Sequence, residues 1–233
     1  MVFKGTIRGI DDVFDTDMYE GSVIIVAGPP GCMKSSFIYS VMSGNLSQTG
    51  KYGMYLTLEQ DKESHMKNMK SIGIKPYERL YTYDYTSTRT MLKESGKDYD
   101  GVAMVKHIIQ TNKQRLGANF TMFALDSMSA LYALAKKKQD VRDQVYDFFR
   151  LLREQNLTSF IIMEVPRHAH FEGPEGTESF LADGVIEMGF MEMKNTVKPY
   201  LQVMKMRATR HSRDKFSIHV DKEGMMLTRE VFQ

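Results

Sequence analysis

The chain has 233 residues, of which 42% are hydrophobic and 26% charged, a composition typical of a globular protein. Its 31 basic and 29 acidic side chains leave a formal net charge of +2, which excludes a strong overall attraction to nucleic acid or membranes. The lone cysteine, Cys32, cannot form an internal disulfide, no apolar run could span a bilayer, and no N-terminal segment has the form of a secretion signal. We expect residues 1–233 to form one cytoplasmic domain.

Strand-like and helix-like segments alternate along much of the chain. Short β-branched or apolar runs predict buried strands, and apolar residues at helical spacing predict helices. The predicted strands are 23–27, 52–58, 79–83, 120–125 and 157–163, and the predicted helices are 35–47, 61–72, 102–116 and 139–155. Asp61 is a predicted N-cap, and Gly73 a predicted helix stop. Residues 84–100 are rich in Ser, Thr, Asp and Gly, so we expect an irregular loop there.

The pattern changes near the C-terminus. From Gly184 onward the sequence predicts antiparallel strands joined by turns, at 184–193, 199–206, 215–220 and 225–227. The whole predicts an α/β fold with a mostly parallel central sheet, flanked by helices and extended by the antiparallel strands at one edge. Ligands of such sheets bind at the carboxyl ends of the parallel strands.

A glycine-rich segment follows the first predicted strand and precedes the first predicted helix. It reads Gly28-Pro29-Pro30-Gly31-Cys32-Met33-Lys34-Ser35-Ser36, in the context that a Walker A phosphate-binding loop requires. Backbone N–H groups of such a loop and the N-terminus of its helix face the phosphates. We expect Lys34 to reach the β- and γ-phosphates and the Ser35 hydroxyl to bind Mg²⁺.

Two residues of this loop are unusual. Met33 stands where the pattern usually has glycine, which is favoured where the backbone needs a positive φ or a close approach to phosphate. We therefore expect Met33 to narrow or strain the loop and to weaken nucleotide binding or turnover. Cys32 lies where a helix N-terminus would lower the pKa of a thiol, although we interpret it as a replacement for a small residue.

Acidic residues end three other predicted strands. Asp126 follows a very apolar run, as in a Walker B element, and is expected to hold the shell of the magnesium ion, with Ser127 hydrogen bonding nearby. Glu59 follows the second strand and is the candidate catalytic base that positions the attacking water, beside Lys34 as the catalytic cation. Glu164 is either a γ-phosphate sensor or a simple strand end.

These motifs together resemble the KaiC family of RecA-type ATPases, in its single-domain archaeal form. Besides the phosphate loop, the resemblance is carried by Gly9-Ile10-Asp11-Asp12-Val13-Phe14, Glu59-Gln60, Leu125-Asp126-Ser127, Leu181-Ala182-Asp183-Gly184-Val185-Ile186 and Lys205-Met206-Arg207-Ala208-Thr209-Arg210-His211. Gln60 stands where the family has a second glutamate. The resemblance runs from about Phe3 to about Leu227, and it implies a RecA-like P-loop core that binds ATP with Mg²⁺ and hydrolyses it.

The resemblance also implies an assembly. In that family the Lys-x-Arg-x-x-x-His element reaches the nucleotide of a neighbouring subunit, so Lys205, Arg207 and His211 would bind the neighbour's ATP in a ring, most often a hexamer. Cations at such a place stabilise charge on the transferred phosphoryl group. Some relatives phosphorylate themselves on adjacent Ser and Thr; here only Ser179 is present, which makes it a candidate phospho-acceptor. The protein partner of such a regulator is not indicated.

Two other functions stay open. Lys136-Lys137-Lys138 and Arg167-His168-Ala169-His170 follow predicted strands, and basic loops there would suit a DNA-binding, recombinase-type ATPase. Met33 and Gln60 are compatible with a nucleotide-sensing module that turns over little ATP. A metal site at His168, His170 and His211 is a weaker hypothesis, because no cysteine or carboxylate lies at a useful spacing.

Overall fold

The computed structural model describes residues 1–94, 96, 99–134, 141–166, 178–193 and 196–229. Within these residues, nine strands form one sheet. The strands are β1 (Val23–Gly28), β2 (Tyr52–Thr57), β3 (Leu80–Asp84), β4 (Phe120–Asp126), β5 (Thr158–Glu164), β6 (Gly184–Met193), β7 (Thr196–Met206), β8 (Phe216–Asp221) and β9 (Gly224–Arg229). The α-helices are α1 (Ile10–Val13), α2 (Lys34–Thr49), α3 (Lys62–Ser71), α4 (Tyr85–Glu94), α5 (Gly101–Leu116), α6 (Met128–Leu134), α7 (Val141–Glu154) and α8 (Glu178–Leu181).

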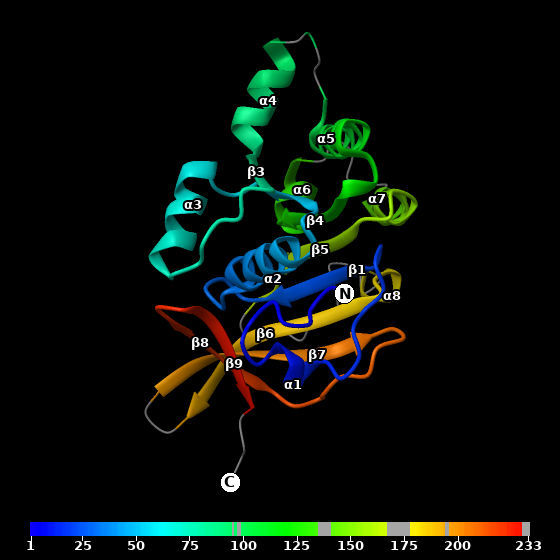
Figure 1. The fold of residues 1–233 in the computed structure, drawn as a ribbon. Helices are drawn as coiled ribbons and strands as arrows, with labels where there is room; N and C mark the ends of the chain where they lie inside the picture. Colours follow the sequence, from blue (N-terminus) through cyan, green and yellow to red (C-terminus); the bar gives the residue numbers. More distant parts are fainter. Residues whose placement is uncertain (95, 97–98, 135–140, 167–177, 194–195, 230–233) are drawn as a thin grey trace.

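The sheet combines a parallel part and an antiparallel part, as the sequence predicts. Its strand order is β3-β2-β4-β5-β1-β6-β7-β8-β9. In this order, the neighbouring strands from β3 through β2, β4, β5 and β1 to β6 pair in parallel. The pairs β6–β7, β7–β8 and β8–β9 are antiparallel. Strand β1 is central, with Val26 opposite Ile162 of β5 and Ile186 of β6. Figure 1 shows the sheet running from β3 to β8 and β9, with α5, α6 and α7 grouped beside β4 and β5.

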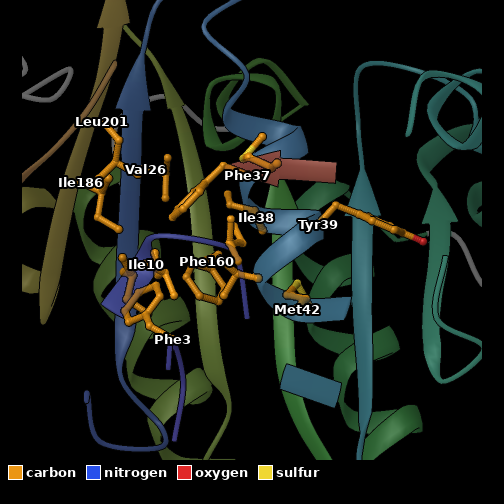
Figure 2. Close-up of a cluster of buried hydrophobic side chains, with 14 of the residues drawn as sticks. Phe3, Ile10, Val26, Phe37, Ile38, Tyr39, Met42, Phe160, Ile186 and Leu201 are labelled. Atoms are coloured by element: carbon orange, nitrogen blue, oxygen red, sulfur yellow. The ribbon is translucent and has the colours of Figure 1, made fainter. Parts of the chain in front are cut away.

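Helix α2 is buried on more than one side, unlike a typical surface helix. Phe37 and Ile38 are fully buried in the cluster that includes Phe3 of the N-terminal segment (Figure 2). The N-terminal segment also passes against the end of the helix, because a Cβ on Gly44 would come within 2.6 Å of the Thr6 carbonyl oxygen. Each fully buried side chain of this size stabilises the fold by roughly 1.5–3 kcal/mol. This packing fixes where α2 begins, and so fixes the loop that precedes it.

Two predictions about the elements need correction, and one helix was not predicted. Residues 85–94 form helix α4, because the Asp84 carboxylate accepts a hydrogen bond from Ser87 N and because Thr88 and Leu92 are buried. Helix α6 was not predicted. Strand β6 is parallel to β1, so the antiparallel part begins only at β7.

The predicted N-cap of α3 is confirmed, since Asp61 accepts a hydrogen bond from Ser64 N. The basic runs 136–138 and 167–170 lie outside the described residues, and so do the two histidines of the second run. In the part of the chain that is described, no helix is long and apolar enough to cross a membrane.

Candidate functional site

The backbone of the loop between β1 and α2 limits which residue types its positions can hold, through one close approach and two positive φ angles. A Cβ on Gly28 would lie 2.0 Å from the Met188 carbonyl oxygen, so no larger residue fits there. Gly31 has a φ of 82° and Met33 a φ of 72°, both in the left-handed region. Met33 thus adopts a positive φ, which is one of the two reasons why glycine is favoured at this position. Holding a non-glycine residue in this region costs roughly 1–2 kcal/mol.

Lys34 is the first residue of α2 and lies over the loop. Its side chain is only 6% exposed. The Nζ atom donates hydrogen bonds of 2.8 Å to the carbonyl oxygens of Gly28 and Pro29, and it lies 3.9 Å from Glu164 Oε1. A buried ammonium group held by carbonyl oxygens can exchange them for the more strongly charged oxygens of a phosphate.

Ser35, at the start of α2, is hydrogen bonded to Asp126, at the end of β4. Ser35 Oγ donates a 2.8 Å hydrogen bond to Asp126 Oδ2, and Tyr55 OH donates one of 2.6 Å to the same oxygen. Asp126 is the last residue of β4 and is 4% exposed. Because the Ser35 hydroxyl uses its proton on Asp126, its lone pairs stay available to a metal ion.

Glu59 and Glu164 flank this group. The Ser127 hydroxyl donates a short hydrogen bond to Glu59 Oε1, which orients that carboxylate. Burial raises the pKa of Glu164, and the nearby charges of Glu59 and Asp126 add to the rise while Lys34 opposes it. The carboxyl ends of the strands therefore bring Lys34 together with three hydroxyls and three carboxylates.

Cys32 is buried, and burial raises the pKa of its thiol despite the opposing charge of Lys34. A raised pKa keeps the thiol protonated and unreactive at neutral pH. The interpretation of Cys32 as a replacement for a small residue fits this environment better than a redox role.

The donor set fits Mg²⁺ and a chain of phosphates. Magnesium is held by one or two protein oxygens, with waters and substrate phosphates completing its shell. Ser35 and Asp126 supply those two oxygens beside the N-terminus of α2, which has no side-chain cap. Among the described residues, no cluster of three or more His, Cys, Asp or Glu could hold a metal on its own. The donors present are thus suited to a metal that substrate oxygens help to bind.

Lys205, Arg207 and His211 are not brought to this group. Met206 of β7 pairs with Gly184, which pairs with Ile24 near the start of β1, so this element lies at the amino end of the parallel strands. Strand β1 separates the two ends by about 16 Å at ~3.3 Å per residue. A lysine or arginine side chain cannot cover that distance. Within one chain Lys205 and Arg207 cannot contact a phosphate held by Lys34.

We call the polar residues at the amino end of the parallel strands the amino-end group: Arg153, Ser179, Asp183, Lys205 and Arg207. Asp183 is the carboxylate that the two arginines share. Its Oδ2 accepts hydrogen bonds from Val23 N and from the Arg153 guanidinium, and its Oδ1 accepts one of 3.2 Å from Arg207 Nη1. Lys205 Nζ donates to the carbonyl oxygens of Ser179 and Ala182, at 2.8 Å each. His211 Nδ1 lies 2.8 Å from the Ser212 carbonyl oxygen.

Sequence reasoning missed the roles of Tyr55 and Arg153. Strand β2 is buried on both faces from Gly53 to Thr57, so its sequence does not reveal which side chain turns toward Asp126. Arg153 lies in α7, where the charged residues have the spacing of an ordinary solvent-exposed helix face. Only the fold shows that it reaches Asp183.

The sheet order, the phosphate loop and the acidic strand end define a P-loop ATPase fold of the RecA type. A family model described as the KaiC ATPase matches residues 3–231, and the chain therefore belongs to the KaiC family of ATPases.

Individual relatives cover almost the whole chain. A UPF0273 protein of Pyrococcus horikoshii is 25% identical over 232 residues, which are 96% of this chain and 92% of that protein. The circadian clock protein KaiC2 of Synechocystis is 22% identical over 225 residues, 94% of this chain but 38% of the clock protein. The crystal structure of a KaiC-like protein from Pyrococcus horikoshii superposes with a TM-score of 0.78 at 21% identity, covering 97% of this chain and 98% of that one. The last similarity establishes the fold alone.

Proposed function

We propose that this chain binds ATP with Mg²⁺ and hydrolyses the bond between its β- and γ-phosphates. One observation carries the proposal: the 2.8 Å hydrogen bond from Ser35 Oγ to Asp126 Oδ2. It joins the phosphate loop to a carboxylate at the end of a different strand, at the edge where parallel sheets bind ligands. A hydroxyl and a carboxylate in this relation are the pair that Mg²⁺-nucleotide sites use.

Each residue has a distinct role in the proposed reaction. Lys34 binds the β- and γ-phosphates after leaving the loop carbonyl oxygens. Ser35 and Asp126 are the residues that would hold Mg²⁺, and the ion would neutralise charge on the phosphates. Glu59, oriented by Ser127, accepts a proton from the water that attacks the γ-phosphorus, as the bond to the bridging oxygen breaks and ADP leaves. Glu164, with its raised pKa, is the alternative base.

The test is steady-state release of ADP from MgATP by the purified protein. Lys34→Ala should abolish release, whereas Lys51→Ala should not, because Lys51 contacts Asn119 on the surface. Glu59→Gln and Glu164→Gln then identify the base, as the one that loses turnover while still binding ATP. Equal background in the wild type and Lys34→Ala would contradict hydrolysis. Tight nucleotide binding without release would favour a nucleotide-sensing module, with Met33 as the first residue to change.

The active assembly in this proposal contains more than one copy of the chain. Lys205, Arg207 and His211 lie at the edge opposite the phosphate loop, so a second copy is needed to bring them to a nucleotide. A closed ring of head-to-tail copies, such as a hexamer, lets every interface use the same two surfaces. Mass photometry with and without a non-hydrolysable ATP analogue tests this assembly, and a monomer under all conditions would contradict it.

Ser179 remains a candidate phospho-acceptor on the same reasoning. Its carbonyl oxygen accepts a hydrogen bond from Lys205, so the residue lies in the amino-end group. Any transfer to its hydroxyl must then come from a nucleotide on another copy. Phosphopeptide mapping after incubation with MgATP is the test, and an unmodified Ser179 would contradict the hypothesis.

A further inference from the structure

Tyr55 lies directly against the carboxylate assigned to the metal. Its side chain is fully buried, and its hydroxyl donates a 2.6 Å hydrogen bond to Asp126 Oδ2. That oxygen also accepts the hydrogen bond from Ser35. Both donors therefore end on one oxygen, and neither of them uses Oδ1. Asp126 is therefore held through Oδ2, and neither Tyr55 nor Ser35 hydrogen bonds to its Oδ1.

The Tyr55 ring has little freedom to leave this position. It stacks on His65 with ring centroids 4.5 Å apart, and it meets Tyr39 edge-on at 5.5 Å. A tyrosine hydroxyl is protonated at neutral pH, so it acts as a donor toward this carboxylate. The carboxylate thus rests on a rigid, neutral donor.

We propose that Tyr55 is a positioning residue for Mg²⁺, which holds Asp126 by Oδ2 so that Oδ1 is presented to the shell of the metal. The inference rests on the proposed function, since it assigns a role toward the same metal site. A carboxylate held by a single donor can rotate about its χ2 torsion, which is broad. Ordering it when the metal arrives then reduces the affinity for Mg²⁺, because pre-organisation is lost.

The experiment compares Tyr55→Phe with Tyr39→Phe. Both variants remove one phenolic oxygen from the same aromatic cluster, but the Tyr39 hydroxyl contacts Met66 Sδ at 3.5 Å and not Asp126. Binding of a fluorescent ADP analogue is measured first in EDTA and then during a titration with Mg²⁺. Thermal unfolding of both variants without nucleotide shows whether each one folds.

Tyr55→Phe should need about tenfold more Mg²⁺ for half-maximal effect, the size expected for a hydrogen bond to a charged group. Its affinity for the analogue in EDTA should be unchanged, and Tyr39→Phe should resemble the wild type in both measurements. An unchanged Mg²⁺ requirement in Tyr55→Phe, or an equal rise in Tyr39→Phe, would overturn the inference. If the wild type itself shows no Mg²⁺-dependent binding, the proposed function fails instead.

Discussion

The two ends of the parallel strands carry polar groups of different construction. At the carboxyl end, Lys34 is held by backbone carbonyl oxygens, and Asp126 is held by two neutral hydroxyl groups. At the amino end, two arginines share the single carboxylate of Asp183. At the carboxyl end, a charged ligand can therefore replace neutral hydrogen-bond partners of Lys34 and Asp126. The amino end is held by ion pairs that also fix the direction of the Lys205–Arg207 segment.

The largest expected effect tests whether the amino end acts on a nucleotide at all. Arg207→Ala should lower the turnover number for ATP by about 10²–10³-fold, because in the proposed shared site Arg207 is a cation beside the transferred phosphoryl group. Nucleotide affinity at the variant's own phosphate loop should change little. The measurement is ADP release alongside binding of a fluorescent ADP analogue. Arg210→Ala is the control three residues along, and normal turnover in Arg207→Ala would separate the two ends functionally.

The carboxyl end should be sensitive to acid through His65. Burial lowers the pKa of His65 to about 4, and neither ring nitrogen has a hydrogen-bond partner within the described chain. The unfolded chain takes up the proton near pH 6.5, whereas the folded chain does so only near pH 4. The free energy of unfolding should therefore fall by up to about 3 kcal/mol as pH drops through this window.

Chemical denaturation at a series of pH values measures that fall. His65→Phe removes the titrating group and keeps an aromatic ring against Tyr55, so its stability should depend less on pH between 4 and 6.5. Identical pH profiles for the variant and the wild type would contradict a neutral buried imidazole.

The amino end should respond to loss of its shared carboxylate. Asp183→Asn leaves Arg153 and Arg207 without their anion, and it should lower the free energy of unfolding by about 2 kcal/mol. The matched control is Asp214→Asn, which breaks an exposed ion pair with Arg229 and should have a much smaller effect. Denaturation at low and high salt measures both. Equal effects in the two variants would show that Asp183 does not organise this end.

The smallest effect concerns Met33. Met33→Gly removes the cost of a left-handed backbone but increases the freedom of the unfolded chain, so it should stabilise the protein by about 1 kcal/mol or less. Met33→Ala keeps the Cβ and the positive φ, and it should not stabilise. Thermal unfolding distinguishes the variants. A less stable Met33→Gly would mean that the methionine side chain contributes more by packing than its backbone costs.

The predictable and unpredictable parts of the molecule differ for physical reasons. Apolar runs that end in Gly28, Asp126 and Glu164 predict strands and their functional ends, because burial and termination are local properties of the sequence. Helix α4 was missed because its sequence is rich in Ser and Thr, which are common in loops and at caps, and its start depends on Asp84 acting as a cap. The contact from Tyr55 to Asp126 joins residues 71 positions apart, so no local pattern predicts it.

The most direct test of a site shared between copies is a mixing experiment with two inactive variants. Lys34→Ala subunits lack the phosphate lysine but keep Arg207, and Arg207→Ala subunits have the reverse defect. In a ring with random mixing, roughly a quarter of the interfaces join an intact loop to an intact arginine, so an equal mixture should recover ATP turnover that neither variant shows alone. A mixture as inactive as its components, under conditions where subunits exchange, would contradict the claim that the two ends of the sheet form one site across neighbouring copies.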